Sequence, residues 1–119
     1  MQPTDIKTFE DACQALGYDA AKVIPDFSGY PVKHQAAMIA HSKLIIITEA
    51  LNDGQPIDLN GAHYEIVLDK TEGFSFSLVS ICLWACRAGS RLCFRSSEVA
   101  EYAAEQFIEL YKEYNVQAA

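Results

Sequence analysis

The fold of this chain is decided by the stretch HYEIVLDKTEGFSFSLVSICLWACRAGSRLCFR, residues 63–95. At its start Tyr64, Ile66 and Leu68 occupy every second position, and acidic residues stand among their neighbours. A period of two residues is typical of a strand with one buried face. Turn-forming residues at 69–73 end the pattern. We therefore expect the first strand of a sheet here.

Two further strands are predicted in the rest of this stretch. Residues 74–86 are long for one strand and lose their alternation between residues 77 and 81, so we expect a bend or bulge there. Residues 88–90 then predict a tight turn into a third strand over residues 91–95. Sequential strands joined by short turns usually pair with each other, so the pattern predicts a three-stranded antiparallel meander.

Helical patterns come before the predicted sheet. Thr8, with Asp11 three residues later, predicts an N-cap for a helix that ends at Leu16, before the stop signal Gly17. A second short turn of helix is expected over residues 19–23.

A long helix is predicted over residues 31–51, because Pro31 suits a first helical turn and a loop sequence follows residue 51. One apolar stripe of this helix consists of Ala37, Ala40, Leu44, Ile47 and Leu51. Ile39, Ile45 and Ile46 fall outside the stripe, which makes the second half of the helix apolar nearly all round. Such a helix is expected to lie at the centre of the fold or in a subunit interface.

A last helix is predicted over residues 98–114, capped by Ser96 or Ser97. Its expected core stripe is Ala100, Ala103, Phe107, Leu110 and Tyr114. The predicted fold is therefore α+β and two-layered, with N-terminal helices, a three-stranded meander and a C-terminal helix. We expect all 119 residues to form one domain.

The composition argues against binding to phosphate backbones and to lipid. Sixteen acidic residues against nine Lys and Arg give a formal net charge of -7, which opposes attraction to nucleic acid or anionic membranes. The first residues, MQPTDIKTFED, lack the basic and apolar regions of a signal peptide, so a cytoplasmic protein is expected. The longest uncharged apolar stretch, residues 73–86, is shorter than the roughly 18 residues that span a bilayer.

Two long stretches resemble one group of proteins. They are FEDACQALGYDAAKVIPDFSGYPVKHQAAMIAHSKLIIITEALN, residues 9–52, and GSRLCFRSSEVAEYAAEQFIELYKEY, residues 89–114. Both resemble small uncharacterised proteins of gut anaerobes and of their phages or mobile elements. Residues 53–88 match less well, because the relatives are richer in Tyr, Trp and Phe there. The resemblance implies a cytoplasmic location and a phage or mobile-element origin, and it assigns no functional residue.

No set of residues has the spacing of a metal, cofactor or catalytic site. His34 and His41 stand two helical turns apart, roughly 10 Å along the axis, which is too far to share one ion. Cys82 and Cys86 lack the spacing of a zinc knuckle, and His63 could reach a partner only through tertiary structure. We therefore expect buried thiols, no metal, no cofactor and no enzyme activity.

Cys93 is the cysteine best suited to reactivity. On the predicted third strand it shares a face with Arg91 and Arg95, and nearby guanidinium groups favour a thiolate. A strand with an ordinary polar face is the preferred interpretation, because a phosphatase-like loop would need an Arg where Val99 stands.

Two surfaces are candidates for binding. The first is a partner or anion surface made by Arg87, Arg91 and Arg95 beside Trp84. The second is an oligomer surface made by Ile39, Ile45 and Ile46. The leading hypothesis is a non-enzymatic interaction or assembly module that binds a protein partner or itself. The alternative is binding of single-stranded nucleic acid or another anionic ligand at the arginines, which the net charge disfavours.

Overall fold

The computed structural model describes residues 2–58, 60–69, 74, 76–83 and 87–117. In chain order its elements are η1 (Pro3–Asp5), α1 (Phe9–Leu16), α2 (Val32–Leu51), β1 (His63–Asp69), β2 (Phe76–Cys82), η3 (Ser90–Leu92), α3 (Ser97–Gln106) and α4 (Ile108–Asn115), where η marks a 3-10 helix. The predicted α+β class is confirmed. None of the described helices combines the length and the apolar character needed to cross a membrane.

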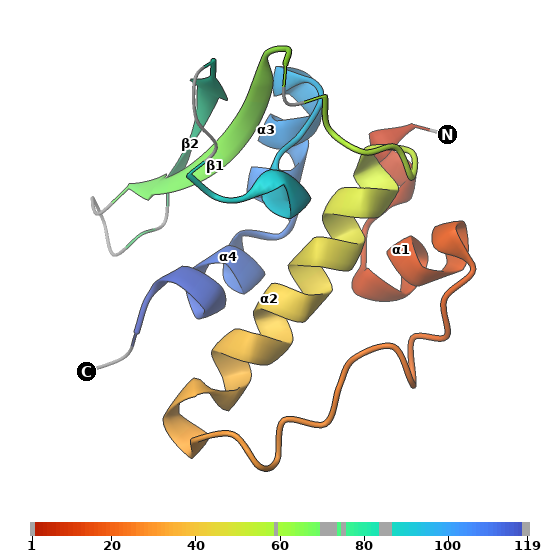
Figure 1. Ribbon diagram of the computed structural model, residues 1–119, viewed down its shortest axis with the longest axis vertical. Coiled ribbons are helices and arrows are strands. Elements are labelled where there is room, and N and C mark those ends of the chain that lie inside the picture. The colour runs from red at the N-terminus through yellow and green to blue at the C-terminus, as the bar shows by residue number, and fades with distance from the viewer. Residues whose placement is uncertain (1, 59, 70–73, 75, 84–86, 118–119) are drawn as a thin grey trace.

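Helix α2 runs through the middle of the molecule (Figure 1). Figure 1 shows α1 on one side of it, and the hairpin, α3 and α4 on the other. The predicted bounds of this helix are confirmed to within one residue. Its buried stripe contributes Leu44 and Ile47 to a core that also takes in Phe9, Phe94 and Phe107. The three isoleucines outside the predicted stripe are half-buried.

The N-terminal helix has the predicted caps. The Thr8 hydroxyl accepts a hydrogen bond from the Asp11 N–H at 3.1 Å, and the Asp11 carboxylate accepts one from the Thr8 N–H at 3.2 Å. Gly17 ends α1 in the left-handed region, at a φ of 77°. Residues 19–23 make a single hydrogen-bonded turn rather than a helix, because only the Asp19 carbonyl accepts bonds from the following turn.

Among the described residues the sheet has two strands rather than the predicted three. β1 and β2 pair antiparallel from His63↔Cys82 to Asp69↔Phe76. Beyond them, Phe94 forms one isolated bridge with Tyr64.

The predicted third strand over residues 91–95 is wrong for two reasons. Its first half is wound into η3, where Leu92 N–H donates to Gly89 O and Cys93 N–H donates to Ser90 O. Its second half bonds to the end of α2: Asn52 Nδ2 donates to Cys93 O at 2.9 Å, and Arg95 N–H donates to Asn52 Oδ1 at 3.2 Å. These two groups face away from the bridge to β1, so on that side one buried side chain takes the place of a further strand.

The predicted C-terminal helix is present but broken at Phe107, whose φ and ψ of -115° and 25° are not helical. Ser96 caps it as predicted, accepting from the Val99 N–H at 3.2 Å. The break lets α3 pack on the sheet while α4 packs on α2. After the break the buried position is Tyr111, and the expected Leu110 and Tyr114 are half-buried.

We expect Asn52→Ala to lower the free energy of unfolding by about 2 to 3 kcal/mol, because it removes two side-chain hydrogen bonds made by a buried amide. Urea unfolding followed by circular dichroism measures this. Asn60→Ala is the matched control, since Asn60 is exposed. Equal stability of the two variants would contradict the role given to Asn52.

Candidate functional site

Three potential metal ligands meet at one end of the sheet. Their donor atoms, one each from His63, Cys82 and Cys93, all lie within 4.8 Å of one another. The register explains the first contact, because directly paired residues of antiparallel strands point to the same face and His63 pairs with Cys82. Cys93 joins them because the next residue, Phe94, bridges to Tyr64, the neighbour of His63. The topology thus brings together residues from three separate segments.

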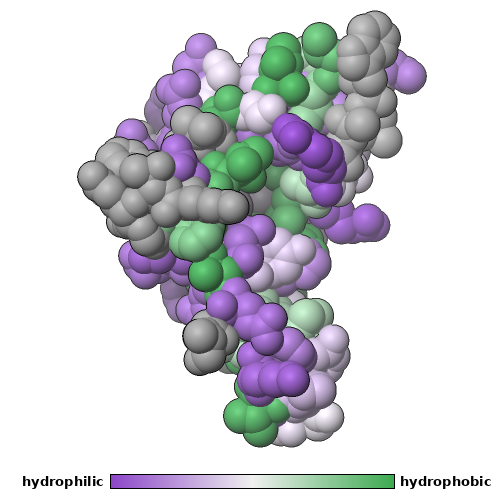
Figure 2. Space-filling view, turned by 90° about the vertical axis from the view of Figure 1, so that its left-hand side faces the viewer, coloured by the Kyte–Doolittle hydropathy of each residue, from purple (hydrophilic) through white to green (hydrophobic). Residues whose placement is uncertain are grey.

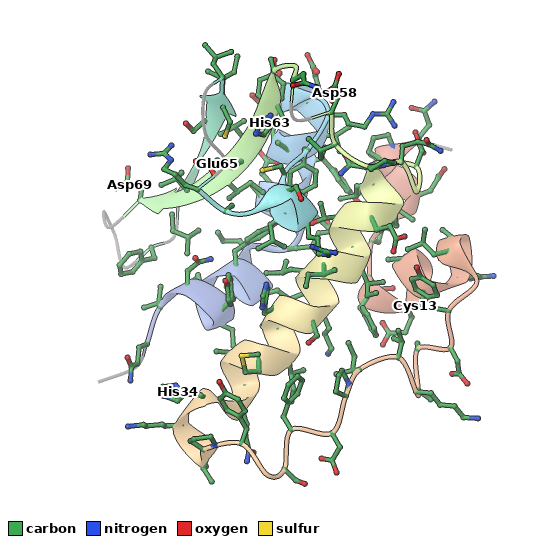
Figure 3. The ribbon with its side chains drawn as sticks, viewed as in Figure 1. Cys13, His34, Asp58, His63, Glu65 and Asp69 are labelled. Atoms are coloured by element: carbon green, nitrogen blue, oxygen red, sulfur yellow. The ribbon has the colours of Figure 1, made fainter. Side chains whose placement is uncertain are left out.

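All three side chains are buried, with exposures of 3% for His63, 4% for Cys82 and 0% for Cys93. The Cys93 thiol donates to Gly89 O at 3.3 Å, and the Cys82 thiol lies 4.0 Å from Ser80 O. Figure 3 shows His63 and Glu65 along β1, with Cys13 on the opposite side of the molecule.

The two nitrogens of His63 have different surroundings. Nδ1 lies 3.2 Å from Gly61 O, which assigns it the proton, because a carbonyl oxygen can only accept. Nε2 is buried and has no hydrogen-bond partner among the described residues. Thr48 Oγ1 and Tyr111 OH are also buried, but these two hydroxyls lie beside each other and can pair, whereas His63 Nε2 has no such partner among the described residues. Burial raises the pKa of Tyr111, and the neighbouring Thr48 hydroxyl offsets a part of this rise.

His34 and His41, which the sequence places two turns apart on one helix, make different ring contacts. The His34 ring packs edge-on against Tyr30, whereas the His41 ring stacks on Tyr114 at 4.4 Å between centroids. Cys86 lies outside the described residues. The cluster that does form contains His63 and one cysteine from each of two other segments. The contact between His63 and Cys82 follows from the strand register, which a correct prediction of the hairpin would have given. The contact with Cys93 had no such signal in the sequence.

A buried carboxylate lies one pair further along the same face. Arg87 Nε donates to Glu65 Oε1 at 2.7 Å, and Ala88 N–H donates to Glu65 Oε2 at 2.9 Å. The Arg87 guanidinium also donates to Ser80 Oγ at 3.0 Å. Glu65 is buried on β1, whereas Arg87 follows β2 and is largely exposed. Their ion pair therefore joins the segment after β2 to the sheet.

The predicted arginine surface is divided. Arg87 is bound to Glu65, and Arg95 donates to the Asn52 carbonyl at 2.9 Å. The hollows that these side chains line differ from the one that Arg91 lines. Trp84 lies outside the described residues. Two of the three guanidinium groups are therefore engaged by the chain itself.

Arg91 and Ile45, taken from the two predicted surfaces, line one hollow of about 380 Å³. Glu49 also lines it and accepts a hydrogen bond from Tyr18 OH at 2.9 Å. Both charges are present, so the hollow has no strong preference for an anion.

No family model, curated protein or solved structure matches this chain.

We expect Arg87→Met to lower the free energy of unfolding by about 1 to 2 kcal/mol, because the buried Glu65 carboxylate loses its cation. Arg91→Met is the matched control and should change it by less than about 0.5 kcal/mol, as exposed sites usually do. Thermal and urea unfolding of both variants at neutral pH measure the difference. Equal losses would show that the Glu65 contact does not hold the segment.

Proposed function

We propose that this protein is a non-enzymatic assembly module that pairs with a second copy of itself through the outer edge of β2. The observation that carries the proposal is an edge strand without charge. β2 has β1 on one side, and no strand lies on its other side in the described part of the chain. Its sequence, FSLVSIC, contains neither a charged residue nor a proline.

Exposed sheet edges normally carry features that prevent pairing. Lysines, prolines or inward-pointing charges usually block them, because their free N–H and C=O groups bind another strand. β2 has none of these residues and instead exposes Ile81 by 51%, with Leu83 just beyond it exposed by 56%. Figure 2 looks at the side of the molecule that carries the hairpin and shows apolar side chains there among polar ones. The edge is therefore open to strand addition.

The proposed occupant of this edge is a second copy of the chain. The chain carries a net charge of -7, so two copies repel over most of their surfaces and approach best where charge is absent. Antiparallel pairing of β2 with its own copy about a two-fold axis makes a four-stranded sheet. It would also enlarge a sheet of two strands, a size that is marginal alone.

The isoleucines of α2 give less support to an oligomer surface than the sequence suggested. Ile45 and Ile46 pack against the core of their own chain, and Ile39 is half-buried. The support for self-association therefore comes mainly from β2.

Binding of nucleic acid at Arg87, Arg91 and Arg95 has less support. Arg87 and Arg95 already bind groups of this chain, and the net charge opposes a polyanion.

We expect the wild-type chain to form a dimer at micromolar concentration, and Ile81→Lys with Leu83→Lys to make it a monomer, since buried lysines without partners prevent strand pairing. Size-exclusion chromatography with light scattering measures the mass. Val32→Lys is the control, because Val32 is exposed by 84% far from the sheet. A wild-type monomer throughout the micromolar range would overturn the proposal, as would a dimer that survives both lysines.

A further inference from the structure

We propose that His63 Nε2, Cys82 Sγ and Cys93 Sγ bind one Zn²⁺ ion, which fastens the two strands and the segment after η3 to one another. This inference does not depend on the assembly function, since the cluster lies inside one chain.

The spacing of the donor atoms is close to that of a zinc site. Zinc bonds of about 2.3 Å to sulfur and 2.0 to 2.1 Å to nitrogen, arranged as a tetrahedron, place the donors roughly 3.5 to 3.8 Å apart. The three donor atoms here are within 4.8 Å of one another. Small side-chain rotations therefore suffice to close the site, and the backbone can keep its register.

The orientation of His63 supplies an independent reason for a ligand. A buried nitrogen without a partner costs free energy, and Nε2 is such an atom within the described residues. Nδ1 faces Gly61 O at 3.2 Å, the arrangement by which metal-binding histidines usually fix their ring and their tautomer. The lone pair of Nε2 is then available to a cation.

Two thiolates and one imidazole select a borderline or soft metal. Sulfur ligands favour Zn²⁺ over Mg²⁺ or Ca²⁺, which take oxygen. Binding releases the two thiol protons, so the charges of the ion and of two thiolates cancel and the buried site is neutral. The neighbouring Glu65 carboxylate is already paired with Arg87 and adds no uncompensated charge. The proton of His63 stays on Nδ1, which donates it to Gly61 O.

Burial assigns the ion a structural role. The three ligands are between 96% and 100% buried, which favours a structural ion, and a water would fill the fourth tetrahedral position that three protein donors leave. His63 also lines a hollow of about 250 Å³ with Asp58 and Arg95, and neither cysteine lines it. The ligands come from β1, β2 and the residue after η3, so the ion would join segments that are distant in sequence.

The first experiment measures the metal directly. The reduced full chain, purified without chelator, should contain about one zinc per chain by plasma mass spectrometry. After removal of zinc, Co²⁺ should give the thiolate charge-transfer and strong visible bands of a tetrahedral sulfur site. No metal together with no Co²⁺ spectrum would overturn the proposal. A Cys82–Cys93 disulfide that persists in the freshly purified chain under anaerobic conditions would also overturn it.

The variants assign the ligands. His63→Gln, Cys82→Ala and Cys93→Ala should each reduce zinc affinity by 100-fold or more and remove or shift the Co²⁺ bands. Cys13→Ala is the matched control, because Cys13 is equally buried but lies in α1, and burial raises the pKa of its thiol. It should bind zinc and cobalt as the wild type does. Unchanged metal binding in the three ligand variants would overturn the assignment.

A stability measurement on the wild type covers the case in which a ligand variant does not fold. Because zinc would bind only the folded chain, the apparent Tm should rise when one equivalent of Zn²⁺ is added to the metal-free protein, and fall again with chelator. Mg²⁺ at the same concentration should leave it unchanged. A Tm indifferent to zinc would overturn the structural role. None of these measurements depends on the oligomeric state. The zinc site and the proposed assembly function are therefore tested independently.

Discussion

The hydrogen bonds that hold the backbone of residues 93–95 organise most of this molecule. Tyr64 and Phe94 exchange two backbone bonds, of 2.9 and 2.7 Å, and Asn52 takes the groups on either side of them. This small set joins the end of α2, the first strand and the start of α3. It also decides what lies at the surface, since it places Cys93 inside the molecule and Arg91 at the rim of a hollow.

Sequence patterns predicted the elements whose signals are local. The Thr8 and Gly17 caps fix α1, periodicity fixes α2, and alternation fixes β1, because each depends on neighbours within a few residues. The third strand failed for a long-range reason: Asn52, a residue that usually ends helices, is buried and takes the place of a paired strand. The break at Phe107 also has a long-range cause, because the residues before it pack on the sheet and the residues after it pack on α2.

The candidate metal cluster was hidden for a related reason. Rules for metal motifs compare residues close in sequence, and they led to His34 with His41 and to Cys82 with Cys86. The cluster instead follows from strand register, which joins His63 to Cys82, and from the Phe94 bridge, which adds Cys93. The first contact is predictable from a correct hairpin turn. The second requires the hydrogen bonds of Asn52, for which the sequence has no local signal.

The polar groups under the sheet also explain why a two-stranded hairpin keeps one register. A slip by one residue would turn every side chain to the other face. His63 would then leave Cys82, and the Glu65 carboxylate would lose both Arg87 and the Ala88 N–H. An apolar face would tolerate such a slip better, because one aliphatic side chain can replace another. Loss of both partners of the buried Glu65 carboxylate penalises the wrong register more strongly than the pair stabilises the right one, and this asymmetry favours the observed register of β2.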